Sequence, residues 1–252
     1  MSAKKLPIAL ELYSVRNEAA ADLFGVLEKT AKMGYDGVEF AGFHGKAAAD
    51  IKKVLDDNGL AVPSCHSRID ALLDPETFLP AVEFHLTIGC PWYVIPWIPK
   101  EMRDSKENCL ATSAKLTELC EKLAAHGMRL GFHAHGDDMH ELPDGGTAWH
   151  YLGANTPASF IMQYDTANGM QGGADPVQPI LDFPGKGASV HLKEWAGGHG
   201  AIIGEGDVPW ARVFEVCESV AGTEWYVVEH EEEGDALDAV AKCLANLRGM
   251  GK

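Results

Sequence analysis

Short apolar runs recur along the chain, separated by longer stretches with the spacing of helices. Four of the helical stretches end at a glycine, which adopts the positive φ of a helix C-terminus without steric strain: Gly34, Gly59, Gly89 and Gly127. In the stretch before Gly127, apolar residues follow one helical face at i, i+3, i+4 and i+7, at Leu116, Leu119, Cys120 and Leu123. The pattern predicts repeated strand–helix units.

The apolar runs are expected to form eight parallel strands, at residues 7–13, 37–41, 61–66, 92–97, 129–135, 159–165, 188–193 and 225–231. Helix-length connections allow such a sheet to close into a barrel, which removes the two exposed edges of an open sheet. The 252 residues match the usual length of this barrel. We therefore predict an α/β fold, a (β/α)8 TIM barrel with a single domain over 1–252. The alternative, an open doubly wound sheet, requires a glycine-rich phosphate turn after an early strand, which the sequence lacks.

Composition narrows the classes of partner. The formal net charge is −16 and no cluster of basic residues exceeds a pair, so nucleic acid is an unfavourable partner. No apolar stretch approaches the roughly 20 residues that cross a bilayer, and Glu11 and Arg16 interrupt the first apolar run, so we expect a soluble, cytoplasmic protein with no membrane partner. The cysteines show no C-x-x-C pair and are expected as buried free thiols: Cys65, Cys90, Cys109, Cys120, Cys217 and Cys243.

Residues able to do chemistry gather at the ends of the predicted strands, where the active site of a parallel barrel lies. They are Glu39, His66, His133, His135, Asp165, His191, Lys193, Glu194, Glu229, His230 and Glu231. A single buried polar residue is often a hydrogen-bonded core group, but a ring of them at equivalent depth indicates a site. Imidazole and carboxylate ligands without thiolate suit one divalent ion such as manganese, magnesium, cobalt or zinc.

Seven segments in order along the chain carry a family resemblance: LELYSVR at 10–16, GYDGVEFAG at 34–42, GFHAHGDD at 131–138, YDTAN at 164–168, VHLKEW at 190–195, GEGDVPW at 204–210 and WYVVEHE at 225–231. In these segments the chain resembles the xylose isomerase-like TIM barrel superfamily. That group contains the sugar isomerases and epimerases, the inosose dehydratases and the barrel of the type 2 AP endonucleases. The resemblance covers nearly the whole chain.

The resemblance implies a metal site with four protein ligands. Three of them would be Asp165, His191 and Glu229. The fourth is expected at the end of the fifth strand, where sugar epimerases of the superfamily usually carry a Glu and this chain carries histidines. His133 is preferred by its position along the strand, with His135 and then Asp138 as alternatives.

A metal in this ring implies chemistry beside a carbonyl group. It would polarise the carbonyl and lower the pKa of the neighbouring C–H, so that an enediolate forms. The candidates for moving the proton are Glu229, Glu39, His66 and Lys193, and the ammonium of Lys193 would also stabilise an oxyanion. Aromatic faces pack on sugar rings and the arginine fork binds carboxylate or phosphate, so the substrate-binding candidates are Arg16, Trp97, His135, Trp195 and Glu231.

The leading hypothesis is a metal-dependent isomerase or epimerase of a keto-sugar or inosose, with a small-molecule sugar or polyol as its substrate. A dehydratase or lyase acting on an inosose or 3-keto-glycoside would use the same metal and the same enediolate, then expel an oxygen substituent. A non-catalytic sugar-binding barrel is the third hypothesis. The endonuclease function conflicts with the acidic charge. A homo-oligomer is compatible with the paired barrels of the superfamily.

Overall fold

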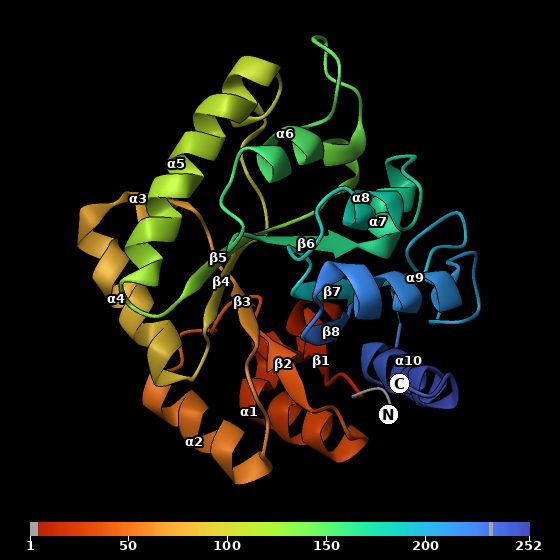
Figure 1. Ribbon diagram of the computed structural model, residues 1–252. Coiled ribbons are helices and arrows are strands. Elements are labelled where there is room, and N and C mark those ends of the chain that lie inside the picture. Colours follow the sequence, from red (N-terminus) through yellow and green to blue (C-terminus); the bar gives the residue numbers. More distant parts are fainter. Residues whose placement is uncertain (1–4, 232–233) are drawn as a thin grey trace.

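The computed structural model describes residues 5–231 and 234–252. Eight parallel strands form one sheet in the order β2-β1-β8-β7-β6-β5-β4-β3 (Figure 1). The strands are β1 (Ile8–Glu11), β2 (Gly37–Glu39), β3 (Ser64–His66), β4 (Trp92–Ile95), β5 (Arg129–His133), β6 (Ile161–Asp165), β7 (Ser189–Leu192) and β8 (Trp225–Val228). Each lies inside one of the predicted apolar runs, so the predicted (β/α)8 barrel is confirmed.

The barrel is nearly closed, and its seam lies between β2 and β3. Isolated parallel bridges join Gly37 to Ala61 and Phe40 to Cys65 across this seam. The amide of Val38 donates to the carbonyl of Ala61 at 2.9 Å. The β2–β3 pairing is therefore sparser than the continuous ladders between the other neighbouring strands.

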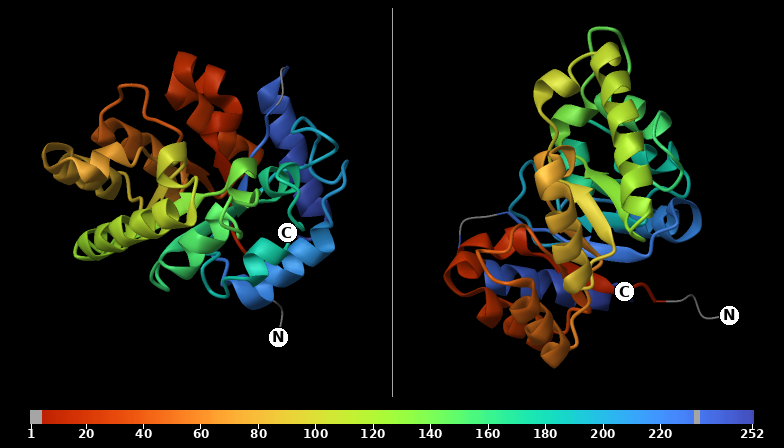
Figure 2. Two further views of the ribbon diagram at one scale, coloured as in Figure 1. Left: turned by 90° about the horizontal axis from the view of Figure 1, so that it is seen from above. Right: turned by 90° about the vertical axis from the view of Figure 1, so that its left-hand side faces the viewer.

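Helices surround the strands on the outside, as Figure 2 shows. They are α1 (Arg16–Met33), α2 (Ala48–Asn58), α3 (Asp70–Leu73), α4 (Pro75–Thr87), α5 (Lys106–Ala124), α6 (Ala148–Ala154), α7 (Thr166–Gln171), α8 (Gln178–Leu181), α9 (Trp210–Val216) and α10 (Ala236–Gly249), with short turns η1 (Leu12–Val15), η2 (Lys100–Met102), η3 (Gly136–Met139) and η4 (Cys217–Ala221). The four glycines predicted to end helices all have positive φ, between 67° at Gly59 and 97° at Gly34.

One hydrophobic core fills the space between the strands and the helices. The predicted face of α5 is buried in it, at Leu116, Leu119, Cys120 and Leu123. The strands are buried on both faces, as expected of a parallel sheet covered by helices, and this explains why they appear in the sequence as apolar runs.

Two further expectations concern the cysteines and membrane association. All six cysteines are free and buried, as predicted. Among the described residues, no helix combines the length and hydropathy that crossing a bilayer requires.

Candidate metal centre

Four side chains from four consecutive strand ends converge at the centre of the barrel. His133 ends β5, Asp165 ends β6, His191 lies in β7 and Glu229 follows β8. One ligating atom of each lies within 4.8 Å of those of the others, and all four residues are buried. The register of the ladder explains the convergence, because Asp165 pairs with His191 and His191 pairs with Val227. The structure thus brings together the four residues that the sequence predicts as metal ligands.

Asp165 carries the observation that best fits a bound cation. Its Oδ1 caps helix α7 by accepting from the amide of Asn168 at 2.7 Å. Its Oδ2 is buried and has no hydrogen-bond partner. Burial, together with the nearby Glu229 carboxylate, raises the pKa of Asp165 to about 7, although Lys193 opposes this shift. A buried carboxylate oxygen without a partner is costly, and coordination of a cation would satisfy it.

The His191 imidazole lies between two carboxylates. Its Nε2 is 2.5 Å from Glu39 Oε2, and its Nδ1 is 2.7 Å from Glu229 Oε2. Burial would lower the pKa of His191, but Glu39 and Glu229 outweigh burial and raise it to about 10, so a metal held by this ring would take the place of one of its protons. Glu39 is itself fully buried on the side of the ring away from Glu229. A carboxylate behind an imidazole in this way fixes the orientation of the ring.

Gln163, which the sequence interpretation overlooked, holds two further histidines. Its Oε1 lies 2.7 Å from His66 Nε2 and 3.1 Å from His133 Nδ1, while its Nε2 donates to Glu39 Oε1 at 2.9 Å. With the proton of His133 on Nδ1, its Nε2 presents a lone pair toward the cluster. Burial lowers the pKa of His133 well below its ordinary value, so the ring is neutral. A neutral imidazole is the form that binds metal.

Lys193 is completely buried beside the cluster. Its Nζ donates to Glu229 Oε1 at 2.9 Å, to Asn168 Oδ1 at 3.3 Å and to Glu231 Oε1. Burial would lower the pKa of Lys193, but the carboxylates of Glu229, Asp165 and Glu231 raise it above its usual range. The side chain is therefore a fixed ammonium in a buried site, where solvent screens a point charge only weakly.

A cavity of about 560 Å³ opens above this cluster. Six of the predicted site residues line it: His66, Trp97, His133, His135, Glu229 and Glu231. Tyr13, Asn168, Gln171 and His199 complete much of its wall. Burial lowers the pKa of His135 to about 4, so this histidine faces the cavity as a neutral group.

The other six predicted site residues are not among the described residues that line this cavity: Arg16, Glu39, Asp165, His191, Lys193 and Trp195. The Arg16 guanidinium lies 4.4 Å above the ring of Tyr13 and donates to the Tyr13 carbonyl at 2.9 Å. Trp195 is half-buried against the core and meets His199 edge to face at 5.2 Å. Each of these side chains reaches the cavity only through a neighbour that lines it. Asp138, the most distant alternative ligand, is instead paired with Arg103 at 2.9 Å.

Glu194 follows Lys193 in the chain, but its carboxylate is engaged in hydrogen bonds that hold a loop. Its two oxygens accept hydrogen bonds from the amides of Trp195, Gly204 and Val208 and from the indole of Trp210. These donors come from the loop between β7 and α9, so one buried carboxylate organises that loop. The GEGDVPW segment at 204–210 supplies three of the four donors.

Two residues beyond Gln163 belong to this site and were not identified from the sequence. Glu11 ends β1, with one oxygen accepting from the Tyr13 amide at 3.0 Å and the other buried without a partner. Asn168 contacts both Lys193 and His133. The same two-residue alternation that pairs His133 with His135 would have placed Gln163 beside Asp165, and the strand-end rule applied to β1 would have identified Glu11.

The chain is similar to several known proteins, two by sequence and one by structure. A rhizopine catabolism protein, MocC, from Rhizobium meliloti is 24% identical over 275 residues, covering 92% of this chain and 83% of the relative. An inosose dehydratase from Geobacillus kaustophilus is 24% identical over 191 residues, covering 67% of this chain but only 61% of that protein. The crystal structure of a sugar phosphate isomerase/epimerase from Parabacteroides distasonis superposes with a TM-score of 0.83 at 22% identity, covering 98% of this chain and 96% of the other.

A protein-family comparison matches most of the chain. The family profile described as "Xylose isomerase-like TIM barrel" matches residues 27–248. This span includes seven of the eight strands and all four residues of the cluster. The chain therefore belongs to the xylose isomerase-like TIM barrel family.

Proposed function

We propose that the protein is a divalent-metal-dependent isomerase or epimerase that moves a proton next to the carbonyl of a keto-sugar or inosose. The single observation that carries the proposal is the cluster of His133, Asp165, His191 and Glu229, in which a buried Asp165 oxygen lacks a partner beside a buried ammonium. The family supports an enzyme of the sugar isomerase, epimerase or dehydratase kind.

The four cluster residues would hold the ion, and their donor set of two imidazoles and two carboxylates suits manganese, cobalt, zinc or magnesium. When bound there, such an ion would polarise the substrate carbonyl and acidify the adjacent C–H. The neutral His133, with Nε2 free of its proton, is already in the form a ligand requires.

The surrounding residues of the chain supply the remaining chemistry. Glu229 lines the cavity and its carboxylate is within reach of a substrate C–H, so we assign it the transfer of the proton. The Lys193 ammonium does not line the cavity itself, but it is bonded to Glu229 and Glu231, which do, and its charge stabilises the negative charge that develops on the substrate oxygens. Glu39 does not line the cavity, so its role is to orient His191 through the Nε2 contact.

His66 forms part of the wall of the cavity above the metal cluster. Its Nε2 is committed to Gln163 at 2.7 Å and one face of its ring stacks on His191 at 5.3 Å. The other face and the Nδ1 edge, which lies 4.0 Å from Glu11 Oε2, remain for the substrate. We assign it substrate positioning and, through Nδ1, a hydrogen bond to a hydroxyl. Trp97, His135 and Glu231 line the same cavity and would contact the remaining hydroxyls or the ring face.

A dehydratase acting on an inosose is the second candidate, and the observation in its favour is the inosose dehydratase relative. Both functions begin with removal of a proton beside a carbonyl. They differ in whether the substrate is reprotonated or loses an oxygen substituent. Proton NMR in deuterated water distinguishes them, because an isomerase incorporates deuterium at carbon and retains every hydroxyl, whereas a dehydratase gives an unsaturated product.

The test of the proposal is metal analysis of the untagged protein before and after chelation, with thermal melting in parallel and ketoses and inososes screened for carbon-bound deuterium exchange. We expect about one equivalent of a divalent ion, a rise in melting temperature on its return, and exchange only in the loaded protein. Metal that neither binds nor stabilises, together with no exchange by any substrate, would assign the barrel to sugar binding without catalysis.

A further inference from the structure

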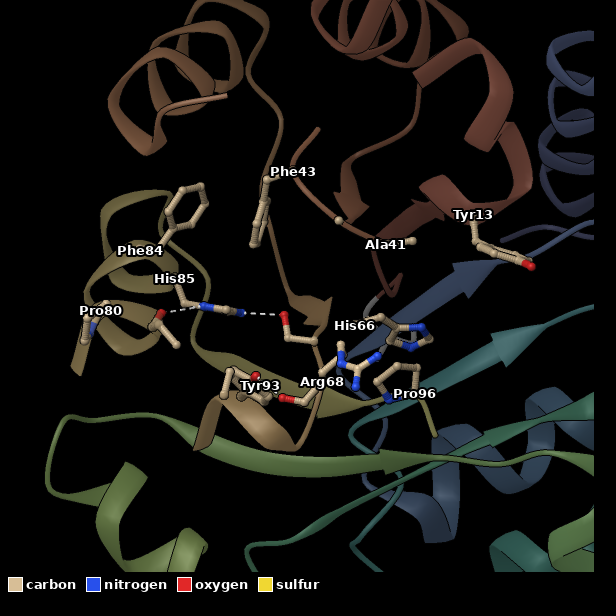
Figure 3. Close-up of a pocket in the computed structure, with 14 residues that line it drawn as sticks. Tyr13, Ala41, Phe43, His66, Arg68, Pro80, Phe84, His85, Tyr93 and Pro96 are labelled. Atoms are coloured by element: carbon tan, nitrogen blue, oxygen red, sulfur yellow. Dashed lines mark hydrogen bonds between the residues drawn. The ribbon is translucent and has the colours of Figure 1, made fainter. Parts of the chain in front are cut away.

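A second cavity of about 650 Å³ adjoins the polar cavity and has a different character. The two share Tyr13, His66 and Pro96, so they meet at the His66 side chain. The wall of the second cavity comes from the segments that follow β2 and β3 and from one side of α4, as Figure 3 shows. We refer to it as the apolar cavity.

Aromatic rings form the end of the apolar cavity farthest from His66. Phe43 and Phe84 lie 4.2 Å apart between ring centroids, and Phe43 meets His85 edge to face at 5.7 Å. His85 in turn stacks on Tyr93 at 4.7 Å. In Figure 3 the Phe43 and Phe84 rings stand together, while Tyr13, His66 and Pro96, which also line the polar cavity, stand on the opposite side. Planar rings in such tilted pairs form a surface suited to another planar ring.

At the aromatic end of this wall the polar atoms are engaged with one another or with the backbone, whereas the exposed side chains of Tyr13 and Arg68 lie toward His66. His85 Nδ1 donates to the carbonyl of Ala81 at 2.7 Å, and the hydroxyl of Ser67 lies 3.0 Å from His85 Nε2. The hydroxyl of Tyr93 donates to the carbonyl of Arg68 at 2.6 Å. These contacts leave little hydrogen-bonding capacity for hydroxyls of a sugar. The part of a ligand that fits here is therefore apolar.

We propose that the substrate has two parts: a hydroxylated ring over the metal cluster, and a planar aromatic substituent on that ring which occupies the apolar cavity, as in an aryl glycoside. The assignment of the first part rests on the proposed function. Because Tyr13, His66 and Pro96 line both cavities, a substituent attached directly to a ring in the polar cavity would lie against the apolar cavity without a spacer. The volume of about 650 Å³ is in the usual range for a small-molecule site.

The test compares two glucosides that differ only in the substituent, phenyl β-D-glucopyranoside and methyl β-D-glucopyranoside. Each is titrated into the metal-supplemented protein, and binding is measured by calorimetry. Burial of a phenyl ring predicts an affinity at least about tenfold tighter than that of the methyl compound. Equal affinity for the two compounds, or no binding of either, would overturn the proposal.

Variants on α4 locate the effect. Ala81 is half-buried and lines the apolar cavity, whereas Glu83 on the same helix is exposed and does not line it. Ala81→Phe is expected to fill the cavity and abolish the preference for the phenyl compound, and Glu83→Phe is the matched control that keeps it. If Ala81→Phe fails to fold, Phe43→Leu provides the milder test, with an expected reduction of the preference by severalfold.

Three outcomes separate the explanations. A preference that survives both Ala81→Phe and Phe43→Leu overturns the proposal. A change of sedimentation behaviour in Ala81→Phe with no change in the preference assigns the cavity to a second copy of the chain instead. Failure of the proposed function would appear differently, as absent metal and absent deuterium exchange alongside an intact phenyl preference, because binding to the apolar cavity requires no turnover.

Discussion

The two adjoining cavities differ in whether the polar atoms around them are hydrogen-bonded within the wall or directed toward a common centre. In the apolar cavity, Ser67, His85 and Tyr93 direct their polar atoms into the wall and engage them there. Glu229 lines the polar cavity, and beneath it Lys193 and Asp165 present their polar atoms toward the same centre, where one Asp165 oxygen has no hydrogen-bond partner. Buried polar atoms without partners destabilise a fold, so they persist where they serve function. The contrast distinguishes a surface that binds from one that reacts.

The largest expected effect comes from removing the unpartnered carboxylate. Asp165→Ala should abolish metal retention and reduce deuterium exchange by about 100-fold or more, because a ligand and its charge are lost together. Asp165→Asn keeps an acceptor for the α7 cap and should give the same loss of metal with a smaller loss of stability. Asp138→Asn is the control, since Asp138 pairs with Arg103. Metal content equal to wild type in both Asp165 variants would contradict the ligand assignment.

Lys193→Met should separate catalysis from metal binding. Methionine matches the length of lysine without its charge, so we expect metal to be retained and turnover to fall by about 100-fold, as when a group that stabilises an oxyanion is removed. Lys186→Met is the matched control. Lys186 is also a buried lysine, but it precedes β7 where Lys193 follows it, and it donates to the Gly153 carbonyl at 2.6 Å. It should lower stability and leave turnover unchanged. Normal turnover in Lys193→Met would exclude this lysine from the reaction.

Gln163→Met should weaken the site without removing a ligand. The amide orients His66 and His133 and donates to Glu39. Loss of such a supporting group costs about 10- to 100-fold in metal affinity, which a chelator competition measures. Gln171→Met is the control, because Gln171 lines the cavity but is exposed. Equal metal affinity in the two variants would show that the histidines are oriented without the amide.

The smallest effect concerns the apolar cavity and is seen in stability. Burial lowers the pKa of His85 below its ordinary value of 6.5. A histidine whose pKa is lowered by folding contributes stability that is present above pH 6.5 and is lost as the pH falls below it. Urea unfolding at pH 7.5 and 5.5 should therefore give a weaker pH dependence for His85→Gln than for wild type. The exposed His126→Gln should retain the wild-type dependence, and an unchanged dependence in His85→Gln would contradict the burial argument.

Much of the fold could be predicted because the strands are buried on both faces and so stand out as apolar runs between helical stretches. The cluster could also be anticipated, because polar residues mark the strand ends and the family resemblance implied His133, Asp165, His191 and Glu229 as the ligands among them. The role of Glu39 was not. It ends its strand like the others, but the structure places its carboxylate behind His191, and strand position alone does not specify which side of a neighbouring ring a side chain contacts.

The apolar cavity was beyond prediction for a different reason. Its aromatic residues come from the loop after β2, from α4 and from β4, which are distant along the chain. Phe43, which lies just beyond a strand end, joins Phe84 and Tyr93 because the loop after β2 packs against α4 and β4. Similarly, the turn in which Arg16 lies directs its guanidinium onto Tyr13 rather than into the site. Loop conformation, which local pattern specifies weakly, decides both cases.

The sparse pairing between β2 and β3 makes this join the least hydrogen-bonded part of the barrel sheet. Strands joined by isolated bridges exchange their amide protons sooner than strands in continuous ladders, so the amides of Val38 and His66 should lose protection before those of β5 to β8. The apolar cavity lies directly above this join, with Ala41 and Gly42 on one side and Ser67 and Arg68 on the other. A molecule seated there would contact both sides at once, so its arrival would be recorded as slower exchange at Val38 as well, in a strand that does not line the cavity.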